Sequence, residues 1–596
     1  MHLLLFRQGI DIIEYYHPIS NYIFLIRIGA ALVEDLRLAC MDPFMSHVLE
    51  KLLILSAFAK EGHQGGMKEE EKTASQVWMV KVCKFVSNNL EDFCQDIYAS
   101  HIIRTVVQCA VGQRFTDKQQ KGRGGTESKQ TEGYDLMMVS RLGEGDREQM
   151  DEVLDTLTAR LTALPKELLT TELCVRVIQV YLSLVSKKQP KTARGVVRHL
   201  LTVCFTDPDQ VDWEDSAVVR LMEALVVAGI NHAKLGPKVM EVLGGKVAEL
   251  AKHPTANFVV QRLLEQILDK ERYLVLAEEV VTGLEEVLAT GATGVLLALT
   301  KSAVRLEAGQ TVVMAGIIKV LHCSEKQELL APLLAHLVTI ECWSEGEHPP
   351  VHLHGSLALQ QLLLFSKPIK VVRSLLGLGS PQLASLLGDP RGCHITDSFL
   401  TSKHVGEKSR EGLVRGLRLV DSTYILPPEP IIDFFFIFRG QLVGLACGKH
   451  GSRTVDALWK HSGLKMKQTM AEELSAKLDI LNSNKFGKFV AQKCYLQVFK
   501  RGKEDWRALL DKEEKVEDMF SDILGNNKRN DEDVKASLKR VAVKEVKGED
   551  SVPEKMAKSE VTKSAVESWL TGNDDDSKPA VKKAKKAKAK SYLDDL

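Results

Sequence analysis

The sequence predicts an all-α protein built as a solenoid of helical repeats. Aromatic residues make up only 6% of the chain, and Leu, Val and Ala dominate its apolar segments, which favours helices over sheets. Apolar residues recur at the spacing of one helical face, as in Val259, Val260, Leu263 and Leu264, and no strong strand alternation is seen. A five-residue pattern also returns along the chain, and such repetition is typical of stacked helical units.

The recurring pattern, called the motif below, has five positions. Position 1 is small or polar, position 2 is a ring or basic residue, positions 3 and 4 are apolar, and position 5 is polar. The clearer copies begin at Ser46, Ser100, Asn257, Cys393, Ser452 and Lys488. The weaker copies begin at Glu172, Ser216, Gly294 and Ser356. Several neighbouring copies lie roughly 40 residues apart, which is the length of one helical repeat.

The spacing within the motif has a physical meaning. On a helix, positions 1 and 5 lie one turn apart on one face, position 2 projects beside them, and positions 3 and 4 point into the stack. Each repeat would therefore offer two polar groups and one stacking group. Reading one unstacked RNA base requires two hydrogen bonds to its edge and a flat partner for its ring, so the pattern indicates RNA binding.

This motif resembles the Pumilio (PUF) repeat, and the chain is most similar to the nucleolar protein 9 family of divergent Pumilio-like proteins. The resemblance covers about residues 35–510. The segments that carry it are HPTANFVVQRLLE (253–265), LALQQLLLFSKP (357–368), PQLASLLGDPRGCHITDSFLTS (381–402), LACGKHGSRTVDALW (445–459) and NKFGKFVAQ (484–492). The resemblance implies a C-shaped α-solenoid of ten to eleven Pumilio-like repeats, and we expect the repeat missing from our count to precede Ser46.

The resemblance also implies a base-reading code at positions 1 and 5. Asn with Gln favours uracil, which fits Asn257 and Gln261 with Phe258 as the stacking ring. Ser with Glu favours guanine, which fits the copy that begins at Ser46, and Ser with Gln favours adenine, which fits the copy that begins at Ser356.

Other copies depart from that code. Asp is shorter than Glu in the copies that begin at Cys393 and Ser452, and an Arg at position 5 suits phosphates better than bases in those that begin at Ser100, Glu172 and Ser216. We therefore expect limited base readout together with backbone and shape recognition. The candidate RNA-binding residues are Ser46, His47, Glu50, Ser100, His101, Arg104, Asn257, Phe258, Gln261, Ser356, Gln360, Cys393, His394, Asp397, Ser452, Arg453, Asp456, Lys488, Phe489 and Gln492.

The resemblance implies a nucleolar or nuclear RNA-binding factor for ribosome biogenesis. It would bind precursor rRNA, single-stranded and structured, and assist processing of the small-subunit 18S rRNA by shielding a cleavage site. Pre-ribosomal particle proteins are the expected partners, and no DNA specificity is expected. The alternative is a HEAT- or armadillo-type scaffold that binds proteins. The concave face distinguishes the two, because such a scaffold needs no register between polar and ring residues, whereas Pumilio-like repeats do.

No enzyme, cofactor or metal site is expected. His450, Gly451 and Ser452 lack the GxSxG context of a hydrolase, and Gly448-Lys449 lacks the spacing of a P-loop. The two histidines in the HLH segment 352–354 have no further ligands at suitable spacing. The eleven cysteines form no CxxC pair, which favours buried, reduced thiols.

The chain divides into three expected regions. Residues 1–30 form an atypical apolar segment, whose longest uncharged stretch has 12 residues (15–26), whereas spanning a bilayer takes about 20. Residues 31–525 form the solenoid, with flexible insertions at about 61–75 and 114–150. Residues 526–596 form a disordered charged tail, and its Lys-rich run 582–590 is typical of a nuclear address. The 79 basic and 79 acidic residues balance, but a neutral chain can still carry a basic face.

Overall fold

The computed structural model describes residues 35–58, 69–115, 136–139, 144–344, 349–417 and 441–525. The chain falls into two compact units, Met1–Trp506 and Arg507–Leu596, and all the motifs lie in the first. The apolar segment 1–30 and the tail 526–596 lie outside the described residues, and of the chain before Ser46, where a further repeat is expected, only residues 35–45 are described.

Ten helices of the first unit each carry one motif at or near their first turn, and we call them the inner helices. They are α4 (Met45–Phe58), α7 (Ala99–Val111), α10 (Glu172–Lys188), α12 (Ser216–Gly229), α15 (Asn257–Gln266), α18 (Thr293–Leu306), α21 (Leu353–Leu362), α24 (Cys393–Thr401), α27 (Gly451–Lys460) and α30 (Lys485–Lys493). Each inner helix packs against the next one along the chain, so the motifs stand side by side in sequence order.

Most repeats consist of an outer helix, a short middle helix and the inner helix. The outer helices are α5 (Glu69–Asn88), α8 (Glu144–Ala163), α11 (Pro190–Cys204), α13 (Gly236–Leu243), α16 (Lys270–Thr282), α19 (Gln310–Val320), α22 (Ile369–Leu376), α25 (Glu407–Gly416) and α28 (Leu464–Ser475). The middle helices are α6 (Leu90–Phe93), α9 (Lys166–Leu169), α14 (Val247–Lys252), α17 (Leu284–Ala289), α20 (Leu330–His336), α23 (Ser380–Gly388), α26 (Gln441–Cys447) and α29 (Leu478–Ser483).

The remaining elements lie at the ends of this array and in its connections. They are α3 (Leu36–Met41), α31 (Leu496–Arg501), α32 (Lys503–Gly525), the 3-10 turns η3 (Pro208–Gln210), η4 (Gln327–Leu329) and η5 (Ile340–Cys342), and the strands β1 (Gln113–Phe115) and β2 (Leu136–Val139). The strands pair antiparallel between α7 and α8.

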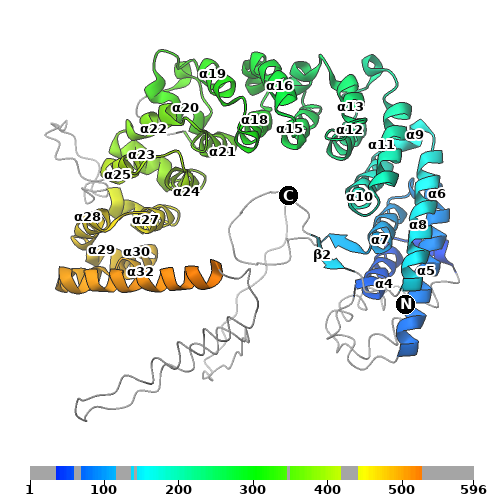
Figure 1. The fold of residues 1–596 in the computed structure, drawn as a ribbon, viewed down its shortest axis with the longest axis horizontal. Coiled ribbons are helices and arrows are strands. Elements are labelled where there is room, and N and C mark those ends of the chain that lie inside the picture. The colour runs from blue at the N-terminus through cyan, green and yellow to red at the C-terminus, as the bar shows by residue number, and fades with distance from the viewer. Residues whose placement is uncertain are drawn as a thin grey trace, which may run out of the picture. The chain divides into compact units, whose positions relative to one another are not determined.

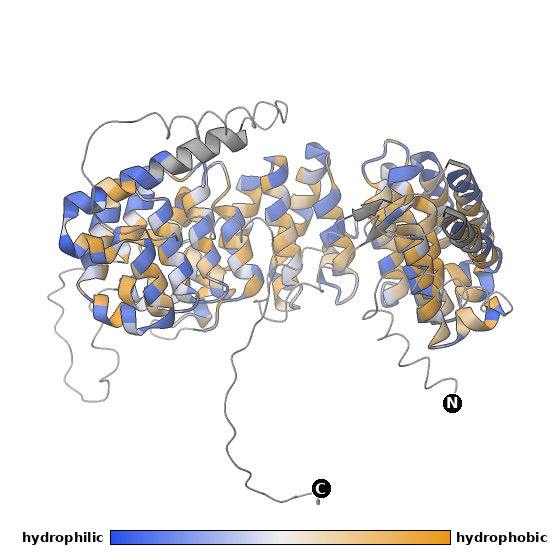
Figure 2. Cartoon of the chain, turned by 90° about the horizontal axis from the view of Figure 1, so that it is seen from below, coloured by the Kyte–Doolittle hydropathy of each residue, from blue (hydrophilic) through white to orange (hydrophobic). Residues whose placement is uncertain are grey.

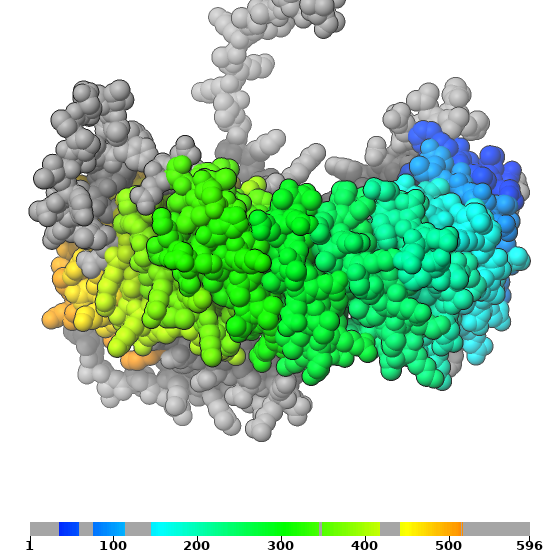
Figure 3. Space-filling view, turned by 90° about the horizontal axis from the view of Figure 1, so that it is seen from above, coloured from blue at the N-terminus to red at the C-terminus, as the bar shows by residue number. Residues whose placement is uncertain are grey.

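Within the first unit the inner helices line the inside of a bend and the outer helices line its outside (Figure 1). Most helices show both hydrophilic and hydrophobic colours, as expected where one face is buried and another exposed (Figure 2). Seen from above, the repeats form consecutive bands in chain order (Figure 3). This is the predicted helical solenoid, in which each repeat packs mainly on its neighbours.

The expected insertions are only partly loops. Helix α5 begins at Glu69, and α8 begins at Glu144, so the ends of both expected insertions are helical. These segments are helical rather than loops because the two helices pack in the core, where Met79, Val82, Met150 and other apolar residues of both are fully buried. Residues 59–68 and 116–135 lie outside the described residues, and β1 and β2 flank the second of these gaps.

In four repeats the start of the inner helix lies very close to the helix before it. A Cβ atom at Gly392 would lie 1.9 Å from the carbonyl oxygen of Leu386, and one at Gly451 would lie 2.5 Å from that of Leu445. These glycines directly precede motif position 1, so the lack of a side chain lets the inner helix turn back tightly. Glycines in the same place in other repeats are Gly355 and Gly487.

Buried hydroxyl groups link neighbouring repeats. Ser302 Oγ donates to the Leu264 carbonyl at 2.6 Å, Ser402 Oγ donates to Leu363 at 2.7 Å, and Thr454 Oγ1 donates to Leu387 at 2.6 Å. Each acceptor lies at or near a helix end, where carbonyls lack partners within their own helix. Satisfying these groups keeps the repeat interfaces free of buried unpaired oxygens at these points.

Two further expectations concern cysteines and membranes. All eleven cysteines lie in the described residues as free thiols, and nine of them are buried, which fits the prediction of reduced thiols packed in the core. Among the described helices, none combines the length and the apolar character that crossing a bilayer requires.

The close approach predicts opposite effects for two glycines of one repeat. Replacing Gly451 with Ala should destabilise the protein by about 2 kcal/mol or more, because the new methyl group would meet the backbone of Leu445. Replacing Gly444, an exposed residue of α26 with nothing within 4 Å of an added Cβ, should stabilise the protein by about 0.5–1 kcal/mol. Denaturant unfolding of both variants measures this, and equal effects would contradict the packing described.

Candidate nucleic-acid interface

Motif positions 3 and 4 point into the stack, as the pattern predicted. In the clearer copies both residues are buried, with exposed fractions of 5% or less. The pairs are Val48 and Leu49, Ile102 and Ile103, Val259 and Val260, Ile395 and Thr396, Thr454 and Val455, and Val490 and Ala491. Two of them have Thr in place of an aliphatic residue, and of these Thr454 uses its hydroxyl in the repeat contact described above.

In the clearer copies position 2 is exposed or half exposed, whereas Ala217 and Val295 of two weaker copies are buried. The rings of Phe258 and Phe489 are 52% and 64% exposed, although large apolar side chains are usually buried. The side chains of His47 and Arg453 are 61% and 60% exposed, and His101 is also exposed. Rings and cations thus stand in register on the inner surface, where a base or a phosphate can reach them.

Position 1 is less accessible than the pattern suggested. Ser46, Ser100, Asn257, Ser356 and Cys393 are each at most 5% exposed, because the first turn packs against the preceding middle helix. Most of these side chains hydrogen-bond locally, as in Ser100 Oγ, which donates to the Ile97 carbonyl at 2.9 Å. Ser452 and Lys488 are more exposed. Position 1 therefore mainly positions its neighbours in most repeats.

The Asn257 amide has one orientation. Its Nδ2 donates to the carbonyls of His253 and Pro254, both at 2.8 Å. A flipped amide would place Oδ1 against these two oxygens, so Oδ1 must face the other way. There it accepts a 2.8 Å hydrogen bond from Gln261 Nε2. Positions 1 and 5 of this repeat are thus joined before any ligand binds.

The next repeat makes room for the Gln261 amide. A Cβ atom at Gly294 would lie 2.5 Å from Gln261 Oε1, so the amide lies against the start of α18. A primary amide carries a donor and an acceptor side by side, which is the pair that a base edge requires. In α21 the same positions are joined by a 3.2 Å hydrogen bond from Gln360 Nε2 to Ser356 Oγ.

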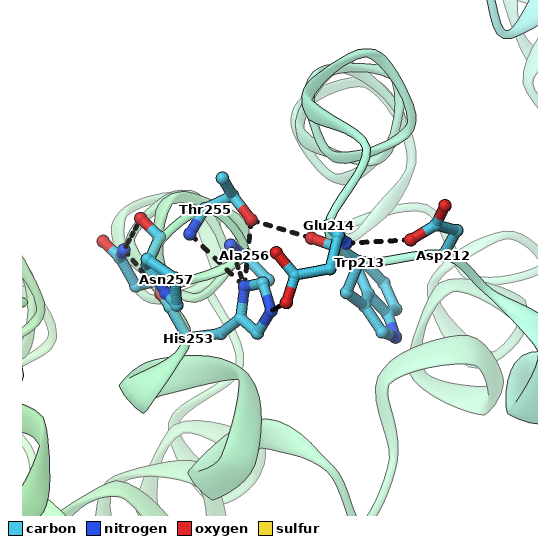
Figure 4. A network of polar contacts seen from close by, with 8 residues as sticks. Asp212, Trp213, Glu214, His253, Thr255, Ala256 and Asn257 are labelled. Atoms are coloured by element: carbon cyan, nitrogen blue, oxygen red, sulfur yellow. Dashed lines mark hydrogen bonds and ion pairs between the residues drawn. The ribbon is translucent and has the colours of Figure 1, made fainter.

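A polar network holds the start of α15 in place (Figure 4). His253 Nδ1 accepts from the backbone N–H groups of Thr255 and Ala256 at 3.3 and 3.1 Å, so its Nε2 carries the proton and donates to Glu214 Oε1 at 3.0 Å. Thr255 Oγ1 donates to the Trp213 carbonyl at 2.7 Å. The network joins the segment before α12 to the turn that positions Asn257.

Acidic residues at position 5 form ion pairs with the next repeat. Asp397 Oδ2 lies 3.7 Å from Arg453 Nε and 3.7 Å from His394 Nδ1. Asp456 Oδ2 lies 3.2 Å from Lys493 Nζ. These short acids therefore help to neutralise the positive charge of the next repeat.

Glu50 is engaged in a similar way. It accepts a 3.0 Å hydrogen bond from Thr105 Oγ1 of α7, the next inner helix. Its other oxygen, Oε2, lies 3.9 Å from His47 Nδ1 of its own repeat.

Three consecutive inner helices, α7, α10 and α12, have Arg at position 5. These are Arg104, Arg176 and Arg220, and the last two contact Glu172. Hydrogen bonds from Arg176 and Arg220 lower the pKa of the Glu172 carboxyl. Burial and the nearby Arg104 lower the pKa of His101, which favours its neutral form at neutral pH.

The described repeats differ in charge along the chain. Residues 441–506 contain twelve basic residues (Lys and Arg) and six acidic ones (Asp and Glu). Residues 144–344 contain twenty-one basic residues and twenty-seven acidic ones. The neutral total thus conceals a basic C-terminal part of the solenoid, which includes Lys488 and Lys493 of α30. A basic surface of this kind favours polyanions.

The weak copy at Gly294 is one residue out of register. Its expected position 5, Ala298, is 1% exposed and buried in the stack. Thr293, one residue earlier, is the residue that contacts another repeat, through a 2.8 Å hydrogen bond between its Oγ1 and His354 Nδ1. The run Val295–Leu299 is apolar in either register, so the pattern alone could not fix it.

The structure also shows contacts near the candidate residues that the sequence did not reveal. His253 contacts Glu214, which lies 39 positions away, and Glu172 contacts Arg220, which lies 48 positions away. Only folding brings these residues together. His352 and His354 lie with ring centroids 5.9 Å apart, and the described residues hold no group of three or more potential metal ligands.

The stacked three-helix repeats, with rings, amides and cations in register on one surface, define an RNA-binding α-solenoid of the Pumilio type. The chain belongs to the NOP9-like PUF repeat family, because the model of the NOP9-like PUF repeat domain matches residues 27–489. The resemblance noted from the sequence is confirmed.

Named relatives agree with this assignment. Human nucleolar protein 9 is 28% identical over 523 residues, covering 81% of this chain and 78% of the human protein. Pumilio homolog 23 of Arabidopsis thaliana is 20% identical over 524 residues, covering 82% of this chain and 65% of that protein.

A solved structure of APUM23 with the sequence GGAAUUGACGG has the same fold. It superposes with a TM-score of 0.62 at 18% identity and covers 82% of this chain and 87% of that chain. A second structure of that protein, with GGAUUUGACGG, gives a TM-score of 0.61 at 17% identity, covering 81% of this chain and 87% of that chain.

The His253 network predicts a specific loss of stability. Replacing His253 with Ala removes the acceptor for two N–H groups at the start of α15 and should cost about 1 kcal/mol, as the loss of a helix cap does. Replacing it with Asn, a good cap acceptor, should restore most of that loss. Denaturant unfolding checks both variants, and equal destabilisation by Ala and Asn would contradict the capping role.

Proposed function

We propose that this protein is a nucleolar ribosome-assembly factor that binds precursor rRNA. By holding single-stranded and structured segments near a processing site of the 18S precursor, it would shield that site from early cleavage. Pre-ribosomal proteins would be its other partners. Its membership of the NOP9-like PUF repeat family and its similarity to proteins named nucleolar protein 9 support this proposal.

The observation that carries the proposal is the register of the inner surface. Exposed rings at position 2 recur on inner helices that pack in chain order, and amides or charges follow at position 5. A protein-binding scaffold would need no such register. We propose that Asn257, Phe258 and Gln261 contact one base, with uracil preferred, and that the other candidate residues contact bases or backbone.

No catalytic group is part of the proposal. The hydroxyl of Ser452 donates to the Lys449 carbonyl at 3.2 Å rather than to a base, so this serine shows no sign of an activated nucleophile. The proposed role is therefore to bind and cover RNA, and the affinity for RNA should rise with the number of phosphates contacted. Affinity should fall with increasing salt as counterions are released.

The stacking role of Phe258 is directly testable. Replacing Phe258 with Ala should weaken binding to a uridine-containing single-stranded RNA by about 1–3 kcal/mol, because one base loses its stacking partner. Replacing it with Tyr should preserve binding. Fluorescence anisotropy at several salt concentrations measures both.

Val275→Ala is a matched control, since Val275 is 65% exposed on the outer helix α16 and should not affect binding. If the parent protein binds RNA no better than an unrelated neutral protein at low salt, the proposed function is wrong. Crosslinking from cells that yields only peptide partners, with no RNA at the inner helices, would favour the scaffold instead.

A further inference from the structure

One carboxylate on the inner surface is shared by two repeats. Glu172 Oε1, at the start of α10, lies 2.6 Å from Arg176 Nη2 of its own helix and 3.0 Å from Arg220 Nη1 of α12. All three side chains are about half exposed, at 53%, 44% and 42%. The two guanidinium groups therefore face solvent while they hold an anion between them.

These two repeats are poorly suited to read a base. At position 2, where other repeats place a ring or a long cation, α10 has Leu173 and α12 has Ala217, which is 4% exposed. A base bound here would have no flat partner to stack on. The groups that remain accessible are charged, and this favours contact with the RNA backbone.

We propose that Arg176 and Arg220 form a seat for one backbone phosphate of bound RNA, and that Glu172 fills this seat as an internal competitor when RNA is absent. The inference rests on the proposed function, RNA binding, and adds a specific site and a residue that limits affinity there.

The chemistry of the three groups supports this assignment. Guanidinium groups donate paired N–H bonds to oxyanions, and a phosphate diester offers two unesterified oxygens, one for each arginine. Glu172 instead shares a single oxygen between them. Ion pairs at this exposure are weak, so a phosphate held by neighbouring contacts can displace the carboxylate.

The neighbouring repeats favour RNA over an acidic peptide as the occupant. On one side, α15 presents Phe258 and Gln261, which suit a base. On the other side, α7 presents His101 and Arg104, and burial together with the nearby charges of Arg104 and Arg176 lowers the pKa of His101. A strand that crosses from α15 to α7 must pass over α12 and α10, and there it would present its phosphates.

The decisive variant is Glu172→Gln, which removes the negative charge but keeps the shape of the side chain. Binding to single-stranded RNA should become about threefold to tenfold tighter at low salt, because the competitor is lost, and the gain should shrink as salt screens the arginines. Arg176→Gln and Arg220→Gln should each weaken binding and reduce the slope of log K against log salt by about one.

Two variants on outer helices serve as charge-matched controls. Glu278→Gln on α16 and Arg198→Gln on α11 change charge by the same amount away from the inner surface, and neither should reproduce these effects. Circular dichroism should show unchanged helix content for all variants, since the substituted side chains are exposed or half exposed.

Unchanged or weaker RNA binding by Glu172→Gln would overturn the inference, as would a gain equal to that of Glu278→Gln. A gain confined to a polyaspartate peptide, with RNA binding unchanged, would overturn it in favour of an acidic protein partner. These outcomes leave the proposed function standing if the parent protein binds RNA and Phe258→Ala weakens that binding. If the parent protein does not bind RNA, the proposed function itself is wrong.

Discussion

In its C-terminal half the inner surface depends on one close contact, the approach of the inner helices α21, α24, α27 and α30 to the carbonyl end of the helix before each of them. In several repeats only a hydrogen atom fits between the two backbones, as at Gly392 and Gly451. The tight turn fixes where the inner helix begins, and the helix start in turn fixes which side chains face outward. Because the same turn recurs in the last four inner helices, α21, α24, α27 and α30, positions 2 and 5 of these repeats come into register.

The polar groups of this surface are arranged before any ligand binds. The Asn257 amide is fixed by two carbonyls, and Gln261 lies against Gly294 of the following repeat. Asp397 and Asp456 pair with basic residues of the next repeat. Such preorganisation lowers the entropy lost on binding, because fewer side chains must be ordered when RNA arrives. Several of these polar groups are held by residues of two neighbouring repeats.

Much of this arrangement could be predicted from sequence because the signals are local. The spacing within one helical turn was enough to identify Val259 and Val260 as buried residues of the stack, but it did not show that Asn257 is buried as well. The predicted register of the motif was wrong in the copy at Gly294, where the following residues are all apolar and fit two registers equally well. The ends of the two expected insertions differ from the structure because the first turns of α5 and α8 are as polar as loops, although the later turns of both helices are buried.

Contacts between repeats could not be read from sequence. The pairing of Glu172 with Arg220 depends on how two inner helices pack, and no spacing rule relates residues 48 positions apart. The burial of Ser46 and Cys393 likewise depends on the preceding middle helix. The candidate residues lie on the inner helices, but the accessibility of position 1 and the partners of position 5 could be seen only in the fold.

The nearest-neighbour packing of the repeats has a consequence for how such a surface can diverge. Since each inner helix contacts mainly the ones beside it, a substitution at position 2 or 5 is felt by at most two neighbours. One repeat can thus have Leu173 where others have a ring, or Arg176 where others have an amide, while the side chains of distant repeats are unaffected. Adjacent repeats share contacts such as that of Glu172 with Arg220, so the surface of the chain can change in small groups of neighbouring repeats rather than as a whole.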